Sequence, residues 1–248
     1  MNTIESEIIK NYARQLHLPS FNNYENVIRQ LSSDESYPAF LINLMKQELD
    51  ERSASGQIRR VKAAKFPINK TLSEFDISRL EHVTEGCIHN LASCDFIRQK
   101  QNIVMVGNPG SGKTHLAIAL GVNACQNGYH VKFYTAVNLA TELAEAAQLN
   151  QLSKIERSLR KTDLLIIDEL SYLTFNRYQS ELLFHIISER SEKSSVIITT
   201  NLSFSEWTQL FENEMMLNAL IDRVTFRSHI LNMNCESSFR MDSSLKSS

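Results

Sequence analysis

The residues of this chain that are best suited to chemistry lie in a glycine-rich turn. Residues 107–114 read Gly-Asn-Pro-Gly-Ser-Gly-Lys-Thr and fit the spacing G-x-x-x-x-G-K-[ST] of a phosphate-binding loop. Glycines let such a loop curl until consecutive N–H groups point at one anion, and a following helix adds the positive end of its dipole. Lys113 can then reach the β- and γ-phosphates of a nucleotide, and the Thr114 hydroxyl can hold Mg²⁺. The residues predicted to bind the nucleotide are Gly107, Asn108, Pro109, Gly110, Ser111, Gly112, Lys113, Thr114 and His115.

Two adjacent carboxylates follow a second apolar run. Residues 164–167 are Leu-Leu-Ile-Ile, typical of a buried parallel strand, and Asp168 and Glu169 come next. Ligands of such sheets bind at the carboxyl ends of the strands, so Asp168 is expected to hold Mg²⁺ through water, opposite Thr114. Glu169 is the candidate for orienting and polarising the attacking water. An acidic turn without chemistry is the alternative, and the upstream phosphate loop makes it the weaker one.

Two further polar residues are candidates for the same catalytic site. Asn201 follows another buried strand, at 196–200, and could hydrogen-bond the water or the γ-phosphate; a helix cap or turn is its alternative role. Arg223 stands beside Asp222 in a helical segment and could complete the site of a neighbouring subunit. From the residues alone, a local surface ion pair, which contributes little to stability, is the preferred interpretation of Arg223.

An alternation of strands and helices must position these residues. Strands are predicted at 103–106, 131–134, 164–168, 196–200 and 229–233. Helices are predicted at about 78–99, 112–127, 136–149, 176–192 and 204–227, the last of them interrupted. This order predicts an α/β domain in which a five-stranded parallel sheet lies between two layers of helices.

The first part of the chain reads as a small all-helical domain. Apolar residues at helical spacing predict segments around 4–16, 24–31 and from Pro38 onward, where Gly56 could break or bend the last helix. The predicted division is a helical domain at 1–65, a linker at 66–77, a nucleotide-binding domain at 78–241 and a serine-rich, disordered tail at 242–248. Leu72 and Phe75 are expected to anchor the linker on the domain that follows.

Composition disfavours several classes of protein. The chain has 248 residues, 42% of them hydrophobic, which is enough for a substantial core. No apolar run approaches the roughly 18 residues that span a bilayer, and the first residues do not resemble a secretory signal. The four cysteines lack metal-binding spacing. We therefore expect a cytoplasmic protein with neither a membrane segment nor a zinc site.

Charge is unevenly distributed. The net charge of −2 disfavours a uniformly basic DNA-binding protein, yet residues 52–65 contain five basic residues and no acid. Most of that charge lies at Arg59, Arg60, Lys62 and Lys65. Judged by charge alone, a solvated helix face explains this stretch as well as a contact with DNA does.

Together, these motifs resemble an IstB-like ATPase, the helper protein of a two-gene bacterial insertion sequence. They are similar, more distantly, to the DnaC helicase loaders and DnaA initiators of the AAA+ superfamily. The residues that carry the resemblance are the phosphate loop through Ala117, the Asp168-Glu169 pair, Thr199-Thr-Asn201, Ala219-Leu-Ile-Asp-Arg223, Lys62-Ala-Ala-Lys-Phe-Pro67, Lys70-Thr-Leu72 and Phe75-Asp76. The resemblance covers nearly the whole chain. Asn108 departs from the family's more common proline or alanine without removing a group that the mechanism needs.

The resemblance implies a AAA+ fold without the usual C-terminal helical lid, and ATP and Mg²⁺ as cofactors. It also implies ATP-dependent homo-oligomers on double-stranded DNA that stimulate the transposase of the same insertion sequence. By that resemblance Asn201 is the sensor asparagine and Arg223 acts in trans, which reverses the preference above. The basic stretch at Arg59, Arg60, Lys62 and Lys65 becomes a DNA-backbone contact. Arg240 resembles a late arginine of the loader clade.

Three other functions stay open. A DnaC-like loader of a replicative helicase would share the ATPase domain, so the N-terminal domain would decide between a helicase and DNA or a transposase as its partner. A metabolic kinase would need an acceptor pocket and lid arginines, and neither is evident. An ATP-binding module without turnover is disfavoured by the presence of Lys113, Asp168 and Glu169.

Overall fold

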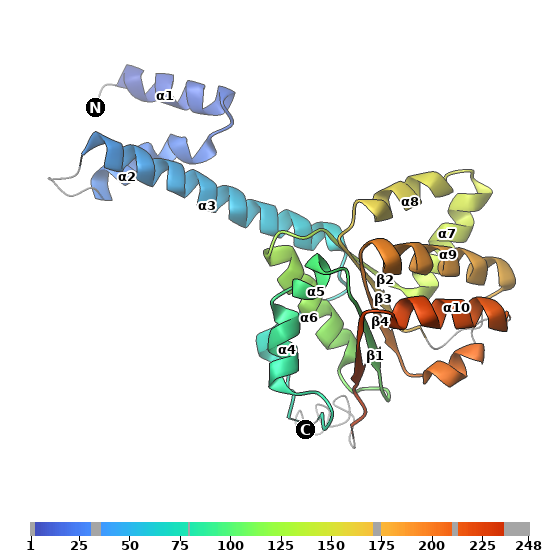
Figure 1. Ribbon diagram of the computed structural model, residues 1–248. Coiled ribbons are helices and arrows are strands. Elements are labelled where there is room, and N and C mark those ends of the chain that lie inside the picture. The colour runs from blue at the N-terminus through green and yellow to red at the C-terminus, as the bar shows by residue number, and fades with distance from the viewer. Residues whose placement is uncertain (1–2, 31–35, 79, 171–174, 210–212, 236–248) are drawn as a thin grey trace, which may run out of the picture. The chain divides into compact units, whose positions relative to one another are not determined.

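The computed structural model describes residues 3–30, 36–78, 80–170, 175–209 and 213–235 (Figure 1). The chain forms two compact units, Met1–Arg59 and Arg60–Ser248, which divide somewhat earlier in the chain than residue 65. The predicted tail at 242–248 and Arg240 lie outside the described residues. None of the described helices combines the length and the apolar composition that crossing a lipid bilayer requires.

The first unit is helical, as the spacing of its apolar residues predicts. Its elements are α1 (Thr3–Gln15), η1 (Pro19–Asn23), α2 (Tyr24–Gln30) and the first part of α3 (Tyr37–Ala64). Tyr24, Val27 and Leu44 form its small core. A break of α3 at Gly56 is not observed, because the helix continues to Ala64; one interior glycine costs a helix only about 1 kcal/mol.

The second unit is built on the predicted five-stranded parallel sheet. The strands are β1 (Asn102–Val106), β2 (Val131–Thr135), β3 (Leu164–Asp168), β4 (Ser195–Thr200) and β5 (Ser228–Asn232). Their order in the sheet is β2-β3-β4-β1-β5, and every neighbouring pair is parallel. Val106 pairs with Thr200 and Ile167 with Ile198. The carboxyl ends of β1, β3 and β4 therefore meet at one edge of the sheet.

Helices cover both faces of the sheet (Figure 1). The helices are α4 (Glu85–Ala92), α5 (Asp95–Arg98), α6 (Lys113–Gln126), α7 (Ala136–Gln148), α8 (Leu152–Arg160), α9 (Arg177–Lys193) and α10 (Glu214–Thr225). Alternate strand residues face opposite layers: Leu164 and Ile166 join the cluster under α4, α5 and α6, whereas Leu165 and Ile167 join the cluster under α7, α9 and α10. This alternation follows from the two-residue period of a strand.

Two details differ from the expected helices. The segment predicted as one helix at 78–99 is instead two short helices, because the Thr84 side chain caps the start of α4 and Cys94, at φ 60°, separates α4 from α5. The interruption predicted within 204–227 is confirmed, because this segment contains η3 (Phe204–Gln209) and then α10. Helix α8 was not predicted at all, although Leu152, Ile155 and Leu159 recur at helical spacing and contact the core.

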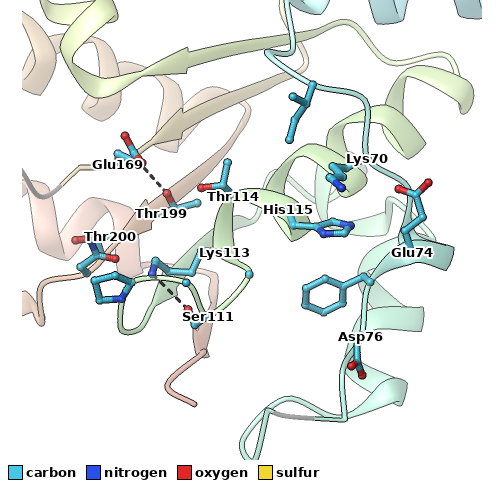
Figure 2. A pocket seen from close by; sticks show the side chains of 16 residues that line it. Lys70, Glu74, Asp76, Ser111, Lys113, Thr114, His115, Glu169, Thr199 and Thr200 are labelled. Atoms are coloured by element: carbon cyan, nitrogen blue, oxygen red, sulfur yellow. Dashed lines mark hydrogen bonds between the residues drawn. The ribbon is translucent and has the colours of Figure 1, made fainter. Parts of the chain in front are cut away.

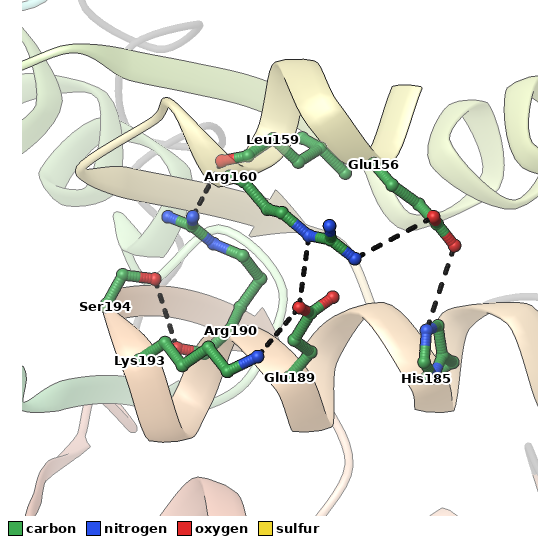
Figure 3. A network of polar contacts seen from close by, with 8 residues as sticks. All are labelled: Glu156, Leu159, Arg160, His185, Glu189, Arg190, Lys193 and Ser194. Atoms are coloured by element: carbon green, nitrogen blue, oxygen red, sulfur yellow. Dashed lines mark hydrogen bonds and ion pairs between the residues drawn. The ribbon is translucent and has the colours of Figure 1, made fainter. Parts of the chain in front are cut away.

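Polar contacts join α8 to α9 (Figure 3). The buried Arg190 of α9 donates hydrogen bonds to the carbonyl oxygens of Leu159, at 2.7 Å, and Thr162. Leu159 belongs to the last turn of α8, whose carbonyl oxygens have no partner inside their own helix, and Thr162 lies just beyond that turn. Burial lowers the pKa of Arg190 to about 10, so this guanidinium keeps its charge at neutral pH.

The segment at 66–77 lies on the second unit. Leu72 and Phe75 pack against the α6 side of the core, which confirms the predicted anchors, and Phe66 packs there as well. A short turn, η2 (Leu72–Glu74), carries a capping box in which Thr71 and Glu74 each bond the backbone of the other. These contacts fix the residues that form one wall of the site described next.

Candidate nucleotide-binding site

The glycine-rich loop leads from β1 into α6, as predicted. Gly107 lies against the backbone that follows β5: a Cβ atom at this position would lie 2.6 Å from both the carbonyl carbon and the carbonyl oxygen of Met233. Gly112 has φ +90°, in the left-handed region that favours glycine. A side chain at Gly112 would also meet the Phe75 ring at 3.1 Å. Local sterics therefore require glycine at both of these positions.

Lys113 is held inside the loop that it closes. Its ammonium donates to the carbonyl oxygens of Gly107 at 2.7 Å and Asn108 at 2.8 Å. It also donates to Ser111 Oγ at 3.4 Å, as Figure 2 shows. The side chain belongs to the first turn of α6 and is buried. The charge is thus placed at the helix N-terminus, where backbone N–H groups also favour an anion.

Asp168 and Thr114 meet at the end of β3. Thr114 Oγ1 donates to Asp168 Oδ1 at 3.0 Å, and the buried Thr199 hydroxyl donates to the same oxygen. Burial raises the pKa of the Asp168 carboxyl, while the hydrogen bonds from Thr199 and Thr114 oppose that rise. A hydroxyl and a carboxylate at hydrogen-bond distance beside a phosphate loop form the oxygen donor set that a hydrated Mg²⁺ prefers, so these residues fit the ion.

Glu169 is oriented by a bond that the sequence motifs do not reveal. Its backbone N–H donates to Thr199 Oγ1 at 2.9 Å (Figure 2), and its φ of 60° is uncommon for a residue other than glycine. The side chain is exposed and faces the cavity beside the loop. Thr199 therefore contacts both acidic residues: its hydroxyl donates to Asp168 and accepts from the backbone of Glu169.

One cavity of about 490 Å³ brings these groups together. Its lining includes most of the phosphate loop, Glu169 and Asn201, together with Thr199 and Thr200 from the end of β4. The opposite wall is formed by residues that were not predicted to line the site: Ile68, Lys70, Glu74, Phe75 and Asp76. The capping-box sequence Thr71-Leu-Ser-Glu74 predicts a turn beside Phe75. Local spacing does not indicate that this turn lies against the phosphate loop.

His115 connects the loop to that wall. Its ring lies edge-on to Phe75, with 5.4 Å between the centroids, and its Nε2 lies 3.4 Å from the Thr71 carbonyl oxygen. Burial lowers the pKa of His115 and thus favours the neutral ring. The cavity thus offers an anion cradle at one end and, at the other, a wall that contains the Phe75 ring beside the charged side chains of Lys70, Glu74 and Asp76, an arrangement that suits a nucleoside triphosphate.

Comparison with known proteins identifies the family. The family model described as IstB-like ATP binding protein matches residues 11–247. The chain belongs to this family. A Geobacillus stearothermophilus protein named for insertion sequence IS5376 and for ATP binding is 36% identical over 233 residues, covering 93% of each chain. A Pseudomonas aeruginosa protein named for insertion sequence IS21 and for ATP binding is 34% identical, covering 94% of this chain and 88% of its own.

Solved structures show which fold this IstB-like chain shares. The DnaC helicase loader aligns with a TM-score of 0.51 at 20% identity, covering 72% of this chain and 99% of its own. AMPPCP-bound DnaA from Aquifex aeolicus aligns with a TM-score of 0.60 at 18% identity, covering 74% of this chain and 57% of its own. The predicted AAA+ fold and the predicted family are therefore confirmed.

The remaining predicted residues of this IstB-like protein lie elsewhere. Arg223, on α10, is not among the residues that line the cavity; its Nε lies 3.1 Å from Oε1 of Glu192 on α9. Arg59 and Lys62 are exposed on α3, and Lys65 is exposed just after that helix. Arg60 has a different environment, because its Nε donates to the Cys125 carbonyl oxygen at 2.8 Å.

Proposed function

We propose that this protein is a DNA-binding, oligomeric ATPase that assists the transposase of a bacterial insertion sequence. The observation that carries the proposal is the convergence of Lys113, Thr114 and Glu169 on one cavity, with Asp168 hydrogen-bonded to Thr114. Relatives of matching length are named for insertion sequences and for ATP binding, which supports this context for the site.

Each residue receives a role that follows from its position. Lys113 and the loop N–H groups bind the phosphates, and Thr114 and Asp168 would hold Mg²⁺, which neutralises charge on the β- and γ-phosphates when bound. Glu169 accepts a proton from the attacking water, because its carboxylate is exposed to the cavity while its backbone is fixed by Thr199. Asn201 lines the same cavity and orients that water or the γ-phosphate.

Hydrolysis in this proposal needs a second copy of the chain. Arg223 does not line the cavity of its own chain, so it is assigned to the site of a neighbouring subunit, where an arginine finger raises turnover roughly 10³- to 10⁵-fold. ATP would thereby stabilise the homo-oligomer, and hydrolysis would release it. The exposed Arg59, Lys62 and Lys65 are assigned to the DNA backbone.

The first experiment measures ATP turnover with and without duplex DNA, alongside size-exclusion chromatography of Glu169→Gln with ATP. We expect DNA to stimulate turnover, and Glu169→Gln to lose turnover while remaining on DNA as a large ATP-bound oligomer. DNA affinity should fall steeply with salt, since each phosphate contact adds to the salt dependence. A monomer in every nucleotide state, with no effect of DNA, would contradict the proposal.

The contribution of the basic stretch is tested separately. The triple variant Arg59→Ala, Lys62→Ala, Lys65→Ala should bind duplex DNA more weakly. The slope of its log affinity against log salt concentration should become shallower by the equivalent of up to about three phosphate contacts. Arg60→Ala is the contrasting variant, because its side chain bonds the Cys125 carbonyl oxygen and its loss should mainly reduce stability. Unchanged DNA binding by the triple variant would remove this stretch from the interface.

A helicase loader is the second candidate, favoured by the fold that the chain shares with the DnaC loader. The helical unit at the N-terminus would then bind a replicative helicase in place of DNA or a transposase. Pull-down by the full chain, with purified helicase and purified transposase offered in parallel, distinguishes the two. Retention of the helicase alone would favour the loader, and retention of the transposase alone would favour the transposition helper.

A further inference from the structure

The side chain of Asn108 is bonded to the segment that follows β5. Its Nδ2 donates to the Cys235 carbonyl oxygen at 2.7 Å, and its Oδ1 accepts from the Cys235 N–H at 3.2 Å. The backbone N–H of Asn108 donates to Asn234 Oδ1 at 2.9 Å. We call Asn108, Asn234 and Cys235 the clasp. Through it, the second residue of the phosphate loop is fixed by both its backbone and its side chain.

The residue before Asn108 is fixed against the same segment by sterics. Gly107 approaches the Met233 backbone so closely that even a methyl group would not fit. The Met233 N–H also donates to the Val106 carbonyl oxygen at 2.7 Å. The first turn of the loop therefore cannot shift toward β5, and a shift away from β5 would break the bonds of the clasp.

The peptide that the clasp fixes also carries acceptors for Lys113. The ammonium bonds the carbonyl oxygens of Gly107 and Asn108, at 2.7 and 2.8 Å. A displacement of Asn108 would move one of these acceptors directly. The position of the Lys113 charge is thus set by contacts that extend to Asn234 and Cys235, which are distant in the sequence.

We propose that Asn108 is a positioning residue, which with Asn234 and Cys235 fixes the Lys113 ammonium for binding nucleotide phosphates. Proline at this position would lack the backbone N–H, and both proline and alanine would lack the side-chain amide, so neither could form the clasp. Nucleotide affinity in this chain therefore depends on the end of β5. The proposal rests on nucleotide binding at the phosphate loop and needs neither hydrolysis nor DNA.

The test is the binding of fluorescently labelled ATP and ADP to full-length variants, with both the dissociation constant and the number of sites measured. Asn108→Ala should raise the dissociation constant roughly tenfold for both nucleotides, since two hydrogen bonds of ordinary strength are lost. The number of sites per chain should not change. Asn234→Ala removes only the acceptor of the Asn108 N–H and should raise the dissociation constant about threefold. If Asn108→Ala does not fold, the dissociation constant of Asn234→Ala still tests the proposal.

Asn123→Ala is the matched control. Asn123 lies on α6, and its Nδ2 donates to the Ala92 carbonyl oxygen at 2.7 Å, so its loss weakens the same unit without touching the loop. A general loss of stability would reduce the number of sites in all three variants and leave their dissociation constants alike. That result, or affinities within twofold of the unaltered chain for Asn108→Ala and Asn234→Ala, would overturn the proposal.

Lys113→Ala separates this inference from the assignment of the site. If Lys113→Ala keeps nucleotide binding, the loop itself is misassigned, and the proposed function fails together with the clasp. If Lys113→Ala abolishes binding while both clasp variants bind normally, only the positioning role of Asn108 is wrong.

Discussion

Nε of Arg223 lies 3.1 Å from Oε1 of Glu192, and the Arg223 guanidinium carbon lies 5.6 Å from the centre of the Phe184 ring. Both partners are on α9, whereas Arg223 is on α10. The side chains of the ion pair are 39% and 59% exposed, for Arg223 and Glu192 respectively, so the pair contributes little to stability. The main effect of these contacts is to orient the Arg223 guanidinium, because Glu192 occupies one of its edges and the Phe184 ring occupies one of its faces.

This orientation allows a test of whether Arg223 acts in trans. Arg223→Ala should lower ATP turnover by roughly 10³-fold while leaving nucleotide affinity unchanged, because the residue does not line its own cavity. Mixing Arg223→Ala chains with Lys113→Ala chains should restore turnover well above that of either variant alone. In such a mixture the Lys113→Ala chains supply the arginine to intact sites of their neighbours. Turnover is measured by phosphate release at equal total protein concentration.

An arginine at the other end of α9 supplies the control for that experiment. Arg177 forms an exposed ion pair with Glu181 at 3.0 Å on the same helix as Glu192. Arg177→Ala should keep turnover close to that of the unaltered chain. If the mixture stays as inactive as its components, Arg223 acts in its own chain or not at all.

Thr199 is the second residue whose removal should affect activity through the site. Thr199→Val keeps the side-chain shape but leaves the Glu169 N–H without its acceptor and Asp168 without one donor. We expect a loss of about 1–3 kcal/mol of stability and a higher Mg²⁺ concentration for half-maximal turnover. Mg²⁺ titrations of ATP turnover, with unfolding by urea in parallel, measure both effects.

Thr200→Val provides the comparison for Thr199→Val. The Thr200 hydroxyl donates to the Leu170 carbonyl oxygen at 2.9 Å and accepts from the Leu202 N–H at 3.1 Å, so its loss costs similar stability without touching Asp168. An equal Mg²⁺ requirement in the two variants would show that Thr199 does not tune the Asp168 site.

The sequence predicted the sheet and the centre of the site because both follow from local patterns. Apolar runs ending in Gly107, Asp168 and Asn201 each indicate a buried strand with polar residues at its carboxyl end, and parallel pairing brings those ends together. The roles of Thr199 and of the Phe75 wall could not be predicted in the same way. They depend on which side chains meet when segments distant in sequence pack, and no local spacing encodes that.

The third prediction concerns the contact between the loop and β5. Gly107→Ala places a methyl group 2.6 Å from backbone atoms of Met233, which cannot move aside as a flexible side chain would. We expect the loop or β5 to shift, with loss of detectable ATP binding and a lower unfolding temperature. Isothermal titration with ATP and thermal unfolding test this outcome.

Gly86→Ala is the matched substitution for Gly107→Ala. The nearest atom to its added methyl group is Thr84 Oγ1 at 4.0 Å, and Gly86 lies in α4. Because alanine favours a helix over glycine by up to about 1 kcal/mol, this variant should be as stable as the unaltered chain or more so. Normal ATP binding by Gly107→Ala would mean that the end of β5 yields easily.

The last prediction concerns the link between α8 and α9, and it compares two arginines in Figure 3. Arg190→Met should cost about 2–3 kcal/mol of unfolding free energy, because the carbonyl oxygen of Thr162 loses the Arg190 donor in a buried environment and that of Leu159 keeps only backbone N–H donors. Arg160→Met removes a guanidinium whose side chain is 59% exposed and paired with Glu189 at 3.2 Å, so it should change stability by less than about 1 kcal/mol. Urea unfolding of the two variants measures the difference. Equal losses would mean that the exposed ion pairs, and not the buried bonds to the end of α8, hold these helices together.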